Sequence, residues 1–502
     1  MRGIFRHGAG RPNAVTIPGG MRKLRFTFRD RRLFVRLFGA DVYAVGGYVR
    51  DTLRRVPSPP DVDILVARRP LEEIVRRLSP LGRVDLVGRS FGVIKFTRRG
   101  KTYDVALPRR EAPTGGRVKG HKDVLIAADP GLPLEQDLER RDFRCNSIAL
   151  RLCDGTLVDP LDGAGDIRKK VIRLTNPKAF PDDPLRVFRA ARFASVLSYR
   201  VDRAVYEAAR GVRLRGLSAE RVNEELFKLL LDSPRPSVGL EEMFRLGALK
   251  ELFPELEALS LVIQDAVFHP ETDAYGHHTV WAHTQLTVDQ AKRLARVAGL
   301  DEPPTLALLL AALFHDLGKA GTTRWEFKRG RMSVTSNGHD IRSERLVRKV
   351  FDRFKIFSWN GYDLRRMVPL LIRTHHRAGE LWSNRKSVTR KAFSRLAAEV
   401  RGEIELLVLL DAADRTGRRA RAVRGLDREA RWLRAKFDEL GVNRETIKPL
   451  LLGRDLIGLG VPPGPEMGRL LKELYQQQLD SVFQTKAGAL RAARRLVKGK
   501  IR

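Results

Sequence analysis

Cysteine is scarce in this sequence. The two thiols, Cys145 and Cys153, exclude a disulfide scaffold and a zinc ribbon built from cysteines, and we expect both to be reduced core residues. Long hydrophobic runs are also lacking, because the longest, Leu306 to Phe314, is too short to span a bilayer and no signal-peptide region precedes it. These absences predict a cytoplasmic protein with no membrane partner.

Acidic residues are in the minority. The chain has 95 lysines and arginines against 60 aspartates and glutamates, which gives a formal net charge of +35. So large a positive field favours a polyanionic partner, and nucleic acid is the leading choice. With 43% hydrophobic and 31% charged residues, the 502-residue chain otherwise has the composition of a globular protein. Its length predicts about two to four domains.

One stretch near the N-terminus has the pattern of a nucleotide site. Val42 to Val45 predicts a buried strand, after which Gly46 and Gly47 turn the chain into a helix that begins near Tyr48. Glycines allow backbone N–H groups to approach a triphosphate, and Arg50 offers a fork of donors that matches phosphate oxygens. A glycine pair after a strand is weak evidence when it stands alone.

Two carboxylates strengthen this interpretation. Asp61 and Asp63 lie in a predicted extended segment, Asp61 to Val66, where residues i and i+2 point to one face. Paired carboxylates need a cation, and Mg²⁺ suits an all-oxygen site that activates a hydroxyl and neutralises a leaving pyrophosphate. Asp104, in the predicted strand Thr102 to Leu107, is a candidate third acid. Standing alone, the pair Asp61 and Asp63 is more typical of a solvated strand edge, and Asp104 is equally typical of an exposed strand residue.

Two later segments supply further candidates. The segment that begins at Arg140 contains Arg141 and Asn146, whose side-chain types suit a triphosphate and a ribose. A helix is predicted to begin near Pro184, and three arginines recur on it at a spacing that is usual for a solvated face. Asp183 lies beside the first of them and forms a donor–acceptor pair able to read a base edge. The three arginines are Arg186, Arg189 and Arg192.

In this order, Gly-Gly-x-Val-Arg-Asp, Asp-x-Asp, Arg-Arg-Asp-Phe-x-x-Asn and Asp-Asp-Pro-Leu-Arg-x-x-Arg-Ala-x-Arg-Phe resemble the class II tRNA nucleotidyltransferases and their bacterial poly(A) polymerase relatives. The resemblance implies an α+β catalytic head with a DNA-polymerase-β-like nucleotidyltransferase fold, followed by all-α neck, HD and tail domains. It implies Mg²⁺ on Asp61 and Asp63, and pairing of Asp183 and Arg186 with the base of CTP or ATP. Triphosphate, sugar and phosphate contacts are implied for Gly46, Gly47, Arg50, Arg141, Asp142, Asn146, Arg189 and Arg192.

The match has small departures. Asp182 stands where the family usually has Glu, and Arg144 and Cys145 replace the usual Thr and Ile. No functional position of the motifs is lost.

A second chemical centre follows. His283, His315-Asp316 and Asp414 occur in an order that resembles the HD phosphohydrolase superfamily, with His339, His375 and His376 between the last two. Imidazole and carboxylate groups at the ends of buried helices suit a divalent transition metal that turns a bound water into hydroxide. Asp411 lies one helical turn before Asp414 and is an alternative ligand. The resemblance implies phosphodiesterase or phosphatase activity on 2′- or 2′,3′-cyclic phosphates, and a purely structural HD domain is the alternative.

These patterns predict five parts. They are a basic, partly disordered extension at 1–36 whose first twenty residues lack order, a catalytic head at 37–165, a helical neck at 166–260, an HD domain at 261–420 and a basic helical tail at 421–502. A Gly-, Pro- and Lys-rich loop from Arg109 to Pro133 is long enough to be a mobile functional element. The segment from Gly453 to Pro465 resembles the tail module of the same enzymes.

The predicted function is addition of CMP and AMP, from CTP and ATP, to the 3′ end of tRNA. The alternatives are an enzyme that adds only CC or only A, a poly(A) polymerase, and an RNA-binding HD phosphohydrolase with an inactive transferase head. The intact Gly-Gly, Asp61, Asp63 and Asp183 oppose the last of these.

Overall fold

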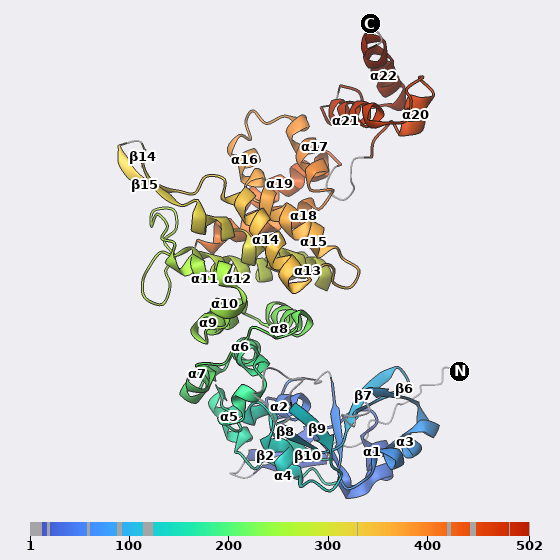
Figure 1. Cartoon of the computed structure of the whole chain (residues 1–502), viewed down its shortest axis with the longest axis vertical. Helices are drawn as coiled ribbons and strands as arrows, with labels where there is room; N and C mark the ends of the chain where they lie inside the picture. Colours follow the sequence, from blue (N-terminus) through green and yellow to red (C-terminus); the bar gives the residue numbers. More distant parts are fainter. Residues whose placement is uncertain are drawn as a thin grey trace, which may run out of the picture. The chain divides into compact units, whose positions relative to one another are not determined.

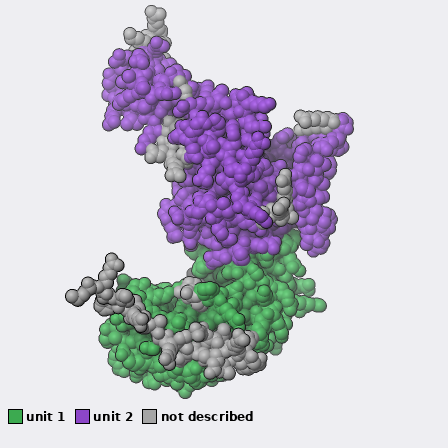
Figure 2. All heavy atoms as spheres, turned by 180° about the vertical axis from the view of Figure 1, so that it is seen from behind, with its two compact units in different colours: residues 1–229, 238–252 green, residues 230–237, 253–502 purple. Residues whose placement is uncertain are grey.

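The chain forms two compact units in a computed structural model, which describes residues 13–17, 21–57, 61–87, 93–113, 124–328, 330–418, 423–441, 448–480 and 482–500. The first unit comprises Met1–Leu229 with Val238–Leu252, and the second Leu230–Ser237 with Phe253–Arg502 (Figure 2). The five-part division expected from the sequence stays a prediction.

A seven-stranded sheet is the centre of the first unit (Figure 1). Its order is β11-β10-β3-β4-β7-β6-β5, in which β4 and β7 are parallel and the other neighbours antiparallel. The strands are β3 (Val42–Val45), β4 (Asp63–Val66), β5 (Arg83–Val87), β6 (Val93–Arg98), β7 (Lys101–Ala106), β10 (Ala149–Arg151) and β11 (Leu157–Val158). The predicted bounds of β3 are confirmed.

Apolar side chains cover both faces of the sheet. On one face, Tyr43 and Leu65 pack with Leu138 of α4. On the other, the ring of Phe34 from α1 lies 5.3 Å from that of Tyr103 and 6.1 Å from that of Phe96. Burial on both sides explains why β3 is uniformly apolar rather than alternating.

Ten helices are described in or at the edge of this unit. They are α1 (Arg31–Phe38), α2 (Gly47–Leu53), α3 (Leu71–Leu78), α4 (Leu134–Glu139), α5 (Gly163–Lys169), α6 (Leu185–Leu197), α7 (Arg203–Ala209), α8 (Ala219–Asp232), α9 (Pro236–Arg245) and α10 (Ala248–Leu252). A short parallel pair, β12 (Val171–Ile172) and β13 (Arg200–Val201), holds the two ends of the α5–α6 region together.

Two expectations about irregular segments need correction. Disorder over the first twenty residues is wrong for β1 (Asn13–Ile17), which pairs with β2 (Met21–Phe26). The segment from Arg109 to Pro133 is in part a hairpin of β8 (Arg109–Pro113) and β9 (Val124–Ala128), and residues 114–123 lie outside the described part of the chain. In both cases a basic or glycine-rich composition masked a neighbouring run of β-branched residues.

The second unit is a helical bundle around one apolar helix, α13 (Glu302–Phe314). Its residues Leu306 to Phe314 have no exposed surface, because α12, α15 and α18 pack around them. The hydrophobic run noted in the sequence is therefore the core of this bundle. Among the described helices, none is long and apolar enough to cross a membrane.

The remaining elements of the unit are mostly helical, as predicted. They are α11 (Pro254–Glu257), α12 (Val280–Ala298), α14 (His339–Phe354), α15 (Leu364–Thr374), α16 (Arg377–Ser383), α17 (Arg390–Glu399), α18 (Ile404–Gly417), α19 (Arg428–Glu439), α20 (Gly453–Ile457), α21 (Pro465–Leu479) and α22 (Lys486–Lys500). The last three form a small core of their own around Leu456, Leu470 and Ala489. A two-stranded hairpin, β14 (Arg324–Lys328) and β15 (Arg331–Thr335), is an addition that the sequence analysis did not predict.

Candidate functional sites: a cationic cleft and a histidine–aspartate centre

Two aspartates lie side by side at the end of the central strands. Asp63 begins β4, and the sheet register places it opposite Val45 on one side and opposite Asp104 on the other. Desolvation, together with the nearby carboxylates of Asp104 and Asp61, raises the pKa of Asp63. Such crowding of acids is relieved by a cation, so these carboxylates fit an Mg²⁺ ion.

All three carboxylates are exposed, and Asp61 and Asp104 each lie near a lysine. The side chain of Asp61 is 89% exposed and its Oδ1 lies 3.8 Å from Nζ of Lys101. Asp104 is paired with Lys95 at 3.2 Å. Both lysine contacts are at the surface, so they hold these carboxylates weakly and a metal ion can displace them.

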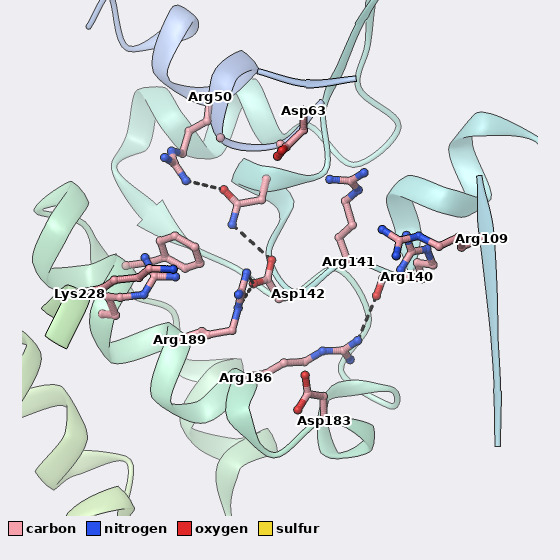
Figure 3. Close-up of a pocket in the computed structure, with 15 residues that line it drawn as sticks. Arg50, Asp63, Arg109, Arg140, Arg141, Asp142, Asp183, Arg186, Arg189 and Lys228 are labelled. Atoms are coloured by element: carbon pink, nitrogen blue, oxygen red, sulfur yellow. Dashed lines mark hydrogen bonds and ion pairs between the residues drawn. The ribbon is translucent and has the colours of Figure 1, made fainter. Parts of the chain in front are cut away.

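A cleft of about 530 Å³ opens above Asp63 (Figure 3). Eight cationic side chains and three carboxylates line it, and with Gly46, Gly47, Asn146 and Phe193 they make up the whole lining. The ionic side chains are those of Arg50, Asp63, Arg109, Arg140, Arg141, Asp142, Asp183, Arg186, Arg189, Arg192 and Lys228. This excess of positive charge in a concave site suits a triphosphate.

Gly46 connects strand and cleft. Its φ of +66° is in the left-handed region, and a Cβ there would lie 3.3 Å from Arg141 Nη1 and 3.4 Å from Asp63 Oδ2. Only a residue without a side chain combines this backbone conformation with such close neighbours. The sequence analysis expected a tight turn here, and this geometry supplies one.

A chain of hydrogen bonds fixes one wall of the cleft. Arg50 donates to Asn146 Oδ1 at 2.8 Å, Asn146 donates to Asp142 Oδ1 at 3.3 Å, and Arg189 donates to Asp142 Oδ2 at 2.8 Å (Figure 3). Burial would raise the pKa of Asp142, but the ion pair with Arg189 outweighs it and lowers that pKa. The network holds two guanidinium groups ready at the cleft without using all their donors.

Asp183 and Arg186 lie at the end of the cleft away from Asp63 (Figure 3). Arg186 donates to the carbonyl oxygens of Ala179 at 2.5 Å and Arg140 at 3.1 Å. Asp183 accepts from Arg221, at 2.9 and 3.2 Å to its two oxygens. The sequence analysis placed Arg221 in the helical neck and assigned it no role in the site.

Two further residues of this site were missed in the sequence. Asp137 is fully buried and accepts from Arg140 at 2.9 Å and from Arg141 at 3.2 Å. Glu225 accepts from Arg192 at 2.5 Å, and the guanidinium carbon of Arg192 lies 4.1 Å from the centre of the Phe193 ring. The signal available for Asp137 was its spacing, three and four residues before Arg140 and Arg141 on a short helical turn.

The second unit contains a cluster of imidazoles and carboxylates. His283 lies on α12, His315 and Asp316 follow α13, and Asp414 lies on α18. His283 Nε2 is 2.8 Å from Asp414 Oδ1, and His315 Nε2 is 3.2 Å from Asp316 Oδ2. All four side chains predicted from the sequence therefore meet at one buried point.

Asp414, rather than Asp411, faces the histidines. Asp411 is instead bonded to Arg415. Burial would raise the pKa of Asp414, but the hydrogen bond from His283 holds that pKa well below its usual range. The alternative of Asp411 as the ligand finds no support in this arrangement.

Three more histidines extend the cluster. His339 begins α14, and its Nε2 lies 3.3 Å from Asp316 Oδ1 and 2.9 Å from Nε2 of His376. His339, His375 and His376 have ring nitrogens within 4.8 Å of one another, so they too are able to hold a metal ion. Burial lowers the pKa of His376 to about 4, which keeps its imidazole neutral. The sequence analysis noted these residues but assigned them no role.

The tautomers of two histidines point to a bound cation. Nδ1 of His315 lies 2.9 Å from the Ala312 carbonyl, and Nδ1 of His375 lies 2.6 Å from that of Ile372. A carbonyl only accepts, so each Nδ1 carries a proton. Burial and the neighbouring imidazoles hold the pKa of His375 well below its usual value, so its Nε2 keeps a free lone pair. In the described part of the chain neither buried Nε2 has a hydrogen-bond partner. Buried imidazole nitrogens without a partner are positions at which a divalent metal can bind.

Glu271 contacts two histidines on the side of the cluster away from Asp414. Its Oε1 lies 2.9 Å from Nδ1 of His283 and 2.9 Å from Nδ1 of His269. Burial would raise its pKa, but the two imidazoles lower that pKa to about 2. A carboxylate in this place fixes the orientation of His283, so that its Nε2 faces Asp414.

Three family models match the chain. They are the poly A polymerase head domain at residues 42–173, the probable RNA and SrmB-binding site of polymerase A at 201–259, and the HD domain at 280–419. The first covers the central sheet and the cleft residues from Gly46 to Asn146, whereas Asp183 and the arginines of α6 lie beyond its end. The third covers the histidine–aspartate cluster from α12 onward. The fold and both sites therefore define a nucleotidyltransferase head joined to an HD domain.

Curated relatives match over most of the chain. A multifunctional CCA protein of Stenotrophomonas maltophilia is 34% identical over 388 residues, which cover 75% of this chain and 86% of the relative. One from Xanthomonas euvesicatoria is 33% identical over 441 residues, covering 86% and 96%. The chain belongs to the multifunctional CCA protein family.

Solved structures share the fold at lower identity. The Bacillus stearothermophilus CCA-adding enzyme, in complex with CTP, matches with a TM-score of 0.58, 21% identity and coverage of 93% of this chain and 97% of that one. The Thermotoga maritima CCA-adding enzyme, complexed with tRNA, matches with a TM-score of 0.52, 21% identity and coverage of 92% and 94%.

Proposed function

We propose that this protein adds CMP and AMP, from CTP and ATP, to the 3′ end of tRNA. The observation that carries the proposal is the register of Asp63 with Asp104 beneath a cleft of eight cationic side chains. Membership in the multifunctional CCA protein family supports it. A cytoplasmic location accompanies this substrate.

The carboxylates and cations of the cleft have separate tasks. Asp61, Asp63 and Asp104 would hold Mg²⁺, which when bound neutralises phosphate charge and lowers the pKa of the attacking ribose hydroxyl. Arg50, Arg141 and Arg189 offer donors to the triphosphate, and Asn146 suits its sugar. Asp142 holds Arg189, Asp137 holds Arg141 and Asn146 accepts from Arg50, so little reorganisation is needed when a nucleotide binds.

Asp183 and Arg186 are proposed to read the base. An acceptor and a planar donor fork at one wall can pair with the edge of cytosine or adenine, with Arg192 near the phosphates. Arg221 holds the Asp183 carboxylate by two hydrogen bonds, so that it is presented in one orientation. The base is thereby selected by protein side chains rather than by a template strand.

The histidine–aspartate centre supports a second activity. We propose that it hydrolyses phosphate esters such as 2′- or 2′,3′-cyclic phosphates on RNA ends, using His283, His315, Asp316 and Asp414 to hold a divalent transition metal. A bound metal of this kind supplies a hydroxide near neutral pH. Lys319, whose Nζ lies 2.7 Å from Asp316 Oδ2, adds a positive charge for a phosphate at the same point.

The decisive experiment is 3′-end sequencing of tRNA transcripts that lack CCA, CA or A, after incubation with the protein, Mg²⁺, CTP and ATP. Extension of all three to a defined CCA end supports full CCA addition. Extension that stops at CC would indicate a CC-adding enzyme, and a single A added only to a CC end would indicate an A-adding enzyme. Long A tails would indicate a poly(A) polymerase. A His315→Ala, Asp316→Ala variant should extend as well as the wild type, because it alters only the second centre.

A further inference from the structure

The β14–β15 hairpin rises from the edge of the histidine–aspartate centre. It occupies the chain between Asp316 and His339, and it projects from the helices of its unit (Figure 1). Thr323 and Ser336 close its base through a 2.8 Å hydroxyl contact. The Ser336 carbonyl accepts from Nδ1 of His339 at 2.7 Å. One hydrogen bond therefore joins the hairpin to an imidazole of the centre.

One face of this hairpin is apolar and open to solvent. Trp325 pairs with Val334 and Phe327 with Met332, so these four side chains share one face. Trp325 is 64%, Phe327 72% and Met332 54% exposed. Two aromatic rings at positions i and i+2 of one strand are rarely left exposed to water unless a partner covers them.

The surroundings of this face are basic and contain more aromatic groups. Arg324 and Arg331 are exposed, and the guanidinium carbon of Arg331 lies 5.7 Å from the ring centre of Phe268, which is 56% exposed. Phe268 belongs to the loop that leads to Glu271, the carboxylate behind His283. The same register pairs Arg331 with Lys328, on the other face of the hairpin from the aromatic rings. We call the open apolar face of Trp325, Phe327 and Met332 the hairpin platform.

We propose that the hairpin platform binds the unpaired 3′ segment of an RNA and directs its terminal phosphate to the histidine–aspartate centre. The inference rests on the proposed phosphohydrolase activity of that centre. Bases of any sequence stack on exposed aromatic faces. Arg324 and Arg331, on the other face of the same narrow hairpin, have side chains long enough to reach the backbone phosphates of a strand that passes its edge. An acidic backbone complements both Arg331 and the +35 charge of the chain.

The dimensions of the hairpin set the length of the ligand. At about 3.3 Å per residue, Trp325 lies roughly 7 Å and Phe327 roughly 13 Å along the strand from Thr323 at the base. A mononucleotide held at the centre cannot contact both rings. An oligonucleotide of about three to five residues can, so the platform favours RNA ends over free nucleotides.

The test compares two substrates that contain the same scissile bond. Steady-state hydrolysis by the metal-loaded full-length protein is measured with a five-residue RNA ending in a 2′,3′-cyclic phosphate and with 2′,3′-cyclic AMP. In a Trp325→Ala, Phe327→Ala variant, the ratio of kcat/KM for the RNA to that for cyclic AMP should fall at least tenfold, mainly through KM. A single Trp325→Phe variant, which keeps an aromatic ring at this position, should retain most of the wild-type ratio. Phe357→Ala, which removes another exposed aromatic ring of the same unit, should not change it.

Binding separates the two proposals. Anisotropy of the labelled five-residue RNA is measured with His315→Ala, Asp316→Ala protein, with and without the hairpin substitutions. If no hydrolysis occurs but the hairpin substitutions weaken binding tenfold, the platform stands and the phosphohydrolase fails. An unchanged substrate ratio together with unchanged RNA binding would overturn the platform. A change confined to self-association, seen by sedimentation, would overturn it in favour of a surface between two copies of the chain.

Discussion

Asp63 and Asp104 occupy opposed positions on the parallel strands β4 and β7. They are 41 residues apart in the sequence, yet the sheet places them side by side below the cationic cleft. Their mutual repulsion contributes to the raised pKa of Asp63. Such a pair is unfavourable unless a cation neutralises it, so its presence indicates a metal-dependent site.

Removal of either carboxylate should abolish nucleotide incorporation. Asp63→Ala and Asp104→Ala should each reduce kcat for CMP addition by about a thousandfold, since metal-held charge stabilises the transition state by several kcal/mol. Their melting temperatures should stay the same or rise, because repulsion is relieved. Asp85→Ala, which removes an exposed acid of β5, is the matched control. Incorporation that persists in Asp63→Ala would refute the assignment of this site.

Arg221 should control base selection. Its two hydrogen bonds to Asp183 fix that carboxylate, so Arg221→Ala should lower the preference for CTP and ATP over UTP and GTP by about tenfold. The ratio of kcat/KM values for the four nucleotides is the measurement. Arg213→Ala removes an exposed arginine of the same unit and should leave the preference intact. Equal losses for all four nucleotides would instead assign Arg221 a role in binding RNA or in folding.

Glu271 should govern metal affinity at the second centre. Glu271→Gln keeps the shape of the side chain but weakens its hold on His283, so the dissociation constant of the bound metal should rise by about 10- to 100-fold. Metal content after dialysis against a weak chelator measures this, with Glu255→Gln as control. Nucleotide addition should be unaffected, since the cleft lies in the other unit. An unchanged metal affinity would show that Glu271 has no such positioning role.

The second unit should lose stability as pH rises from 5 to 8. Asp411, Asp427 and Glu429 surround the single guanidinium of Arg415. Burial and this crowding raise the pKa of Asp411 to about 6 and that of Glu429 to about 7. A carboxyl with a raised pKa stabilises the fold while protonated, and this contribution is lost as pH passes through the folded-state value.

Urea unfolding of wild type and Asp411→Asn at several pH values checks this prediction. The amide cannot ionise. The free energy of unfolding of the variant should therefore rise by about 1–3 kcal/mol relative to that of the wild type as pH increases from 5 to 8. Asp352→Asn, at an exposed ion pair with Arg365, should follow the wild type throughout. If the free energies of unfolding of Asp411→Asn and the wild type change with pH by the same amount, the raised pKa of Asp411 is contradicted.

Local sequence was sufficient for the elements that carry the motifs. The apolar run Val42 to Val45 forms a strand with the predicted bounds, because a short continuous run of β-branched and aromatic residues indicates a strand buried on both faces. Gly46 and the order of the charged motifs identified the family. The same composition misled at Asn13–Ile17, where basic neighbours hid a strand.

Only the tertiary structure decided which residues act together. Asp137, Arg221, Glu225 and Glu271 are ordinary helix or loop residues in sequence, and their roles follow from partners that are distant along the chain. The choice between Asp411 and Asp414 depended on the rotation of α18, since both lie within one turn. The exposed face of the β14–β15 hairpin likewise required the strand register. Sequence determines local propensity and motif, whereas long-range packing determines which charges meet and which rings remain in solvent.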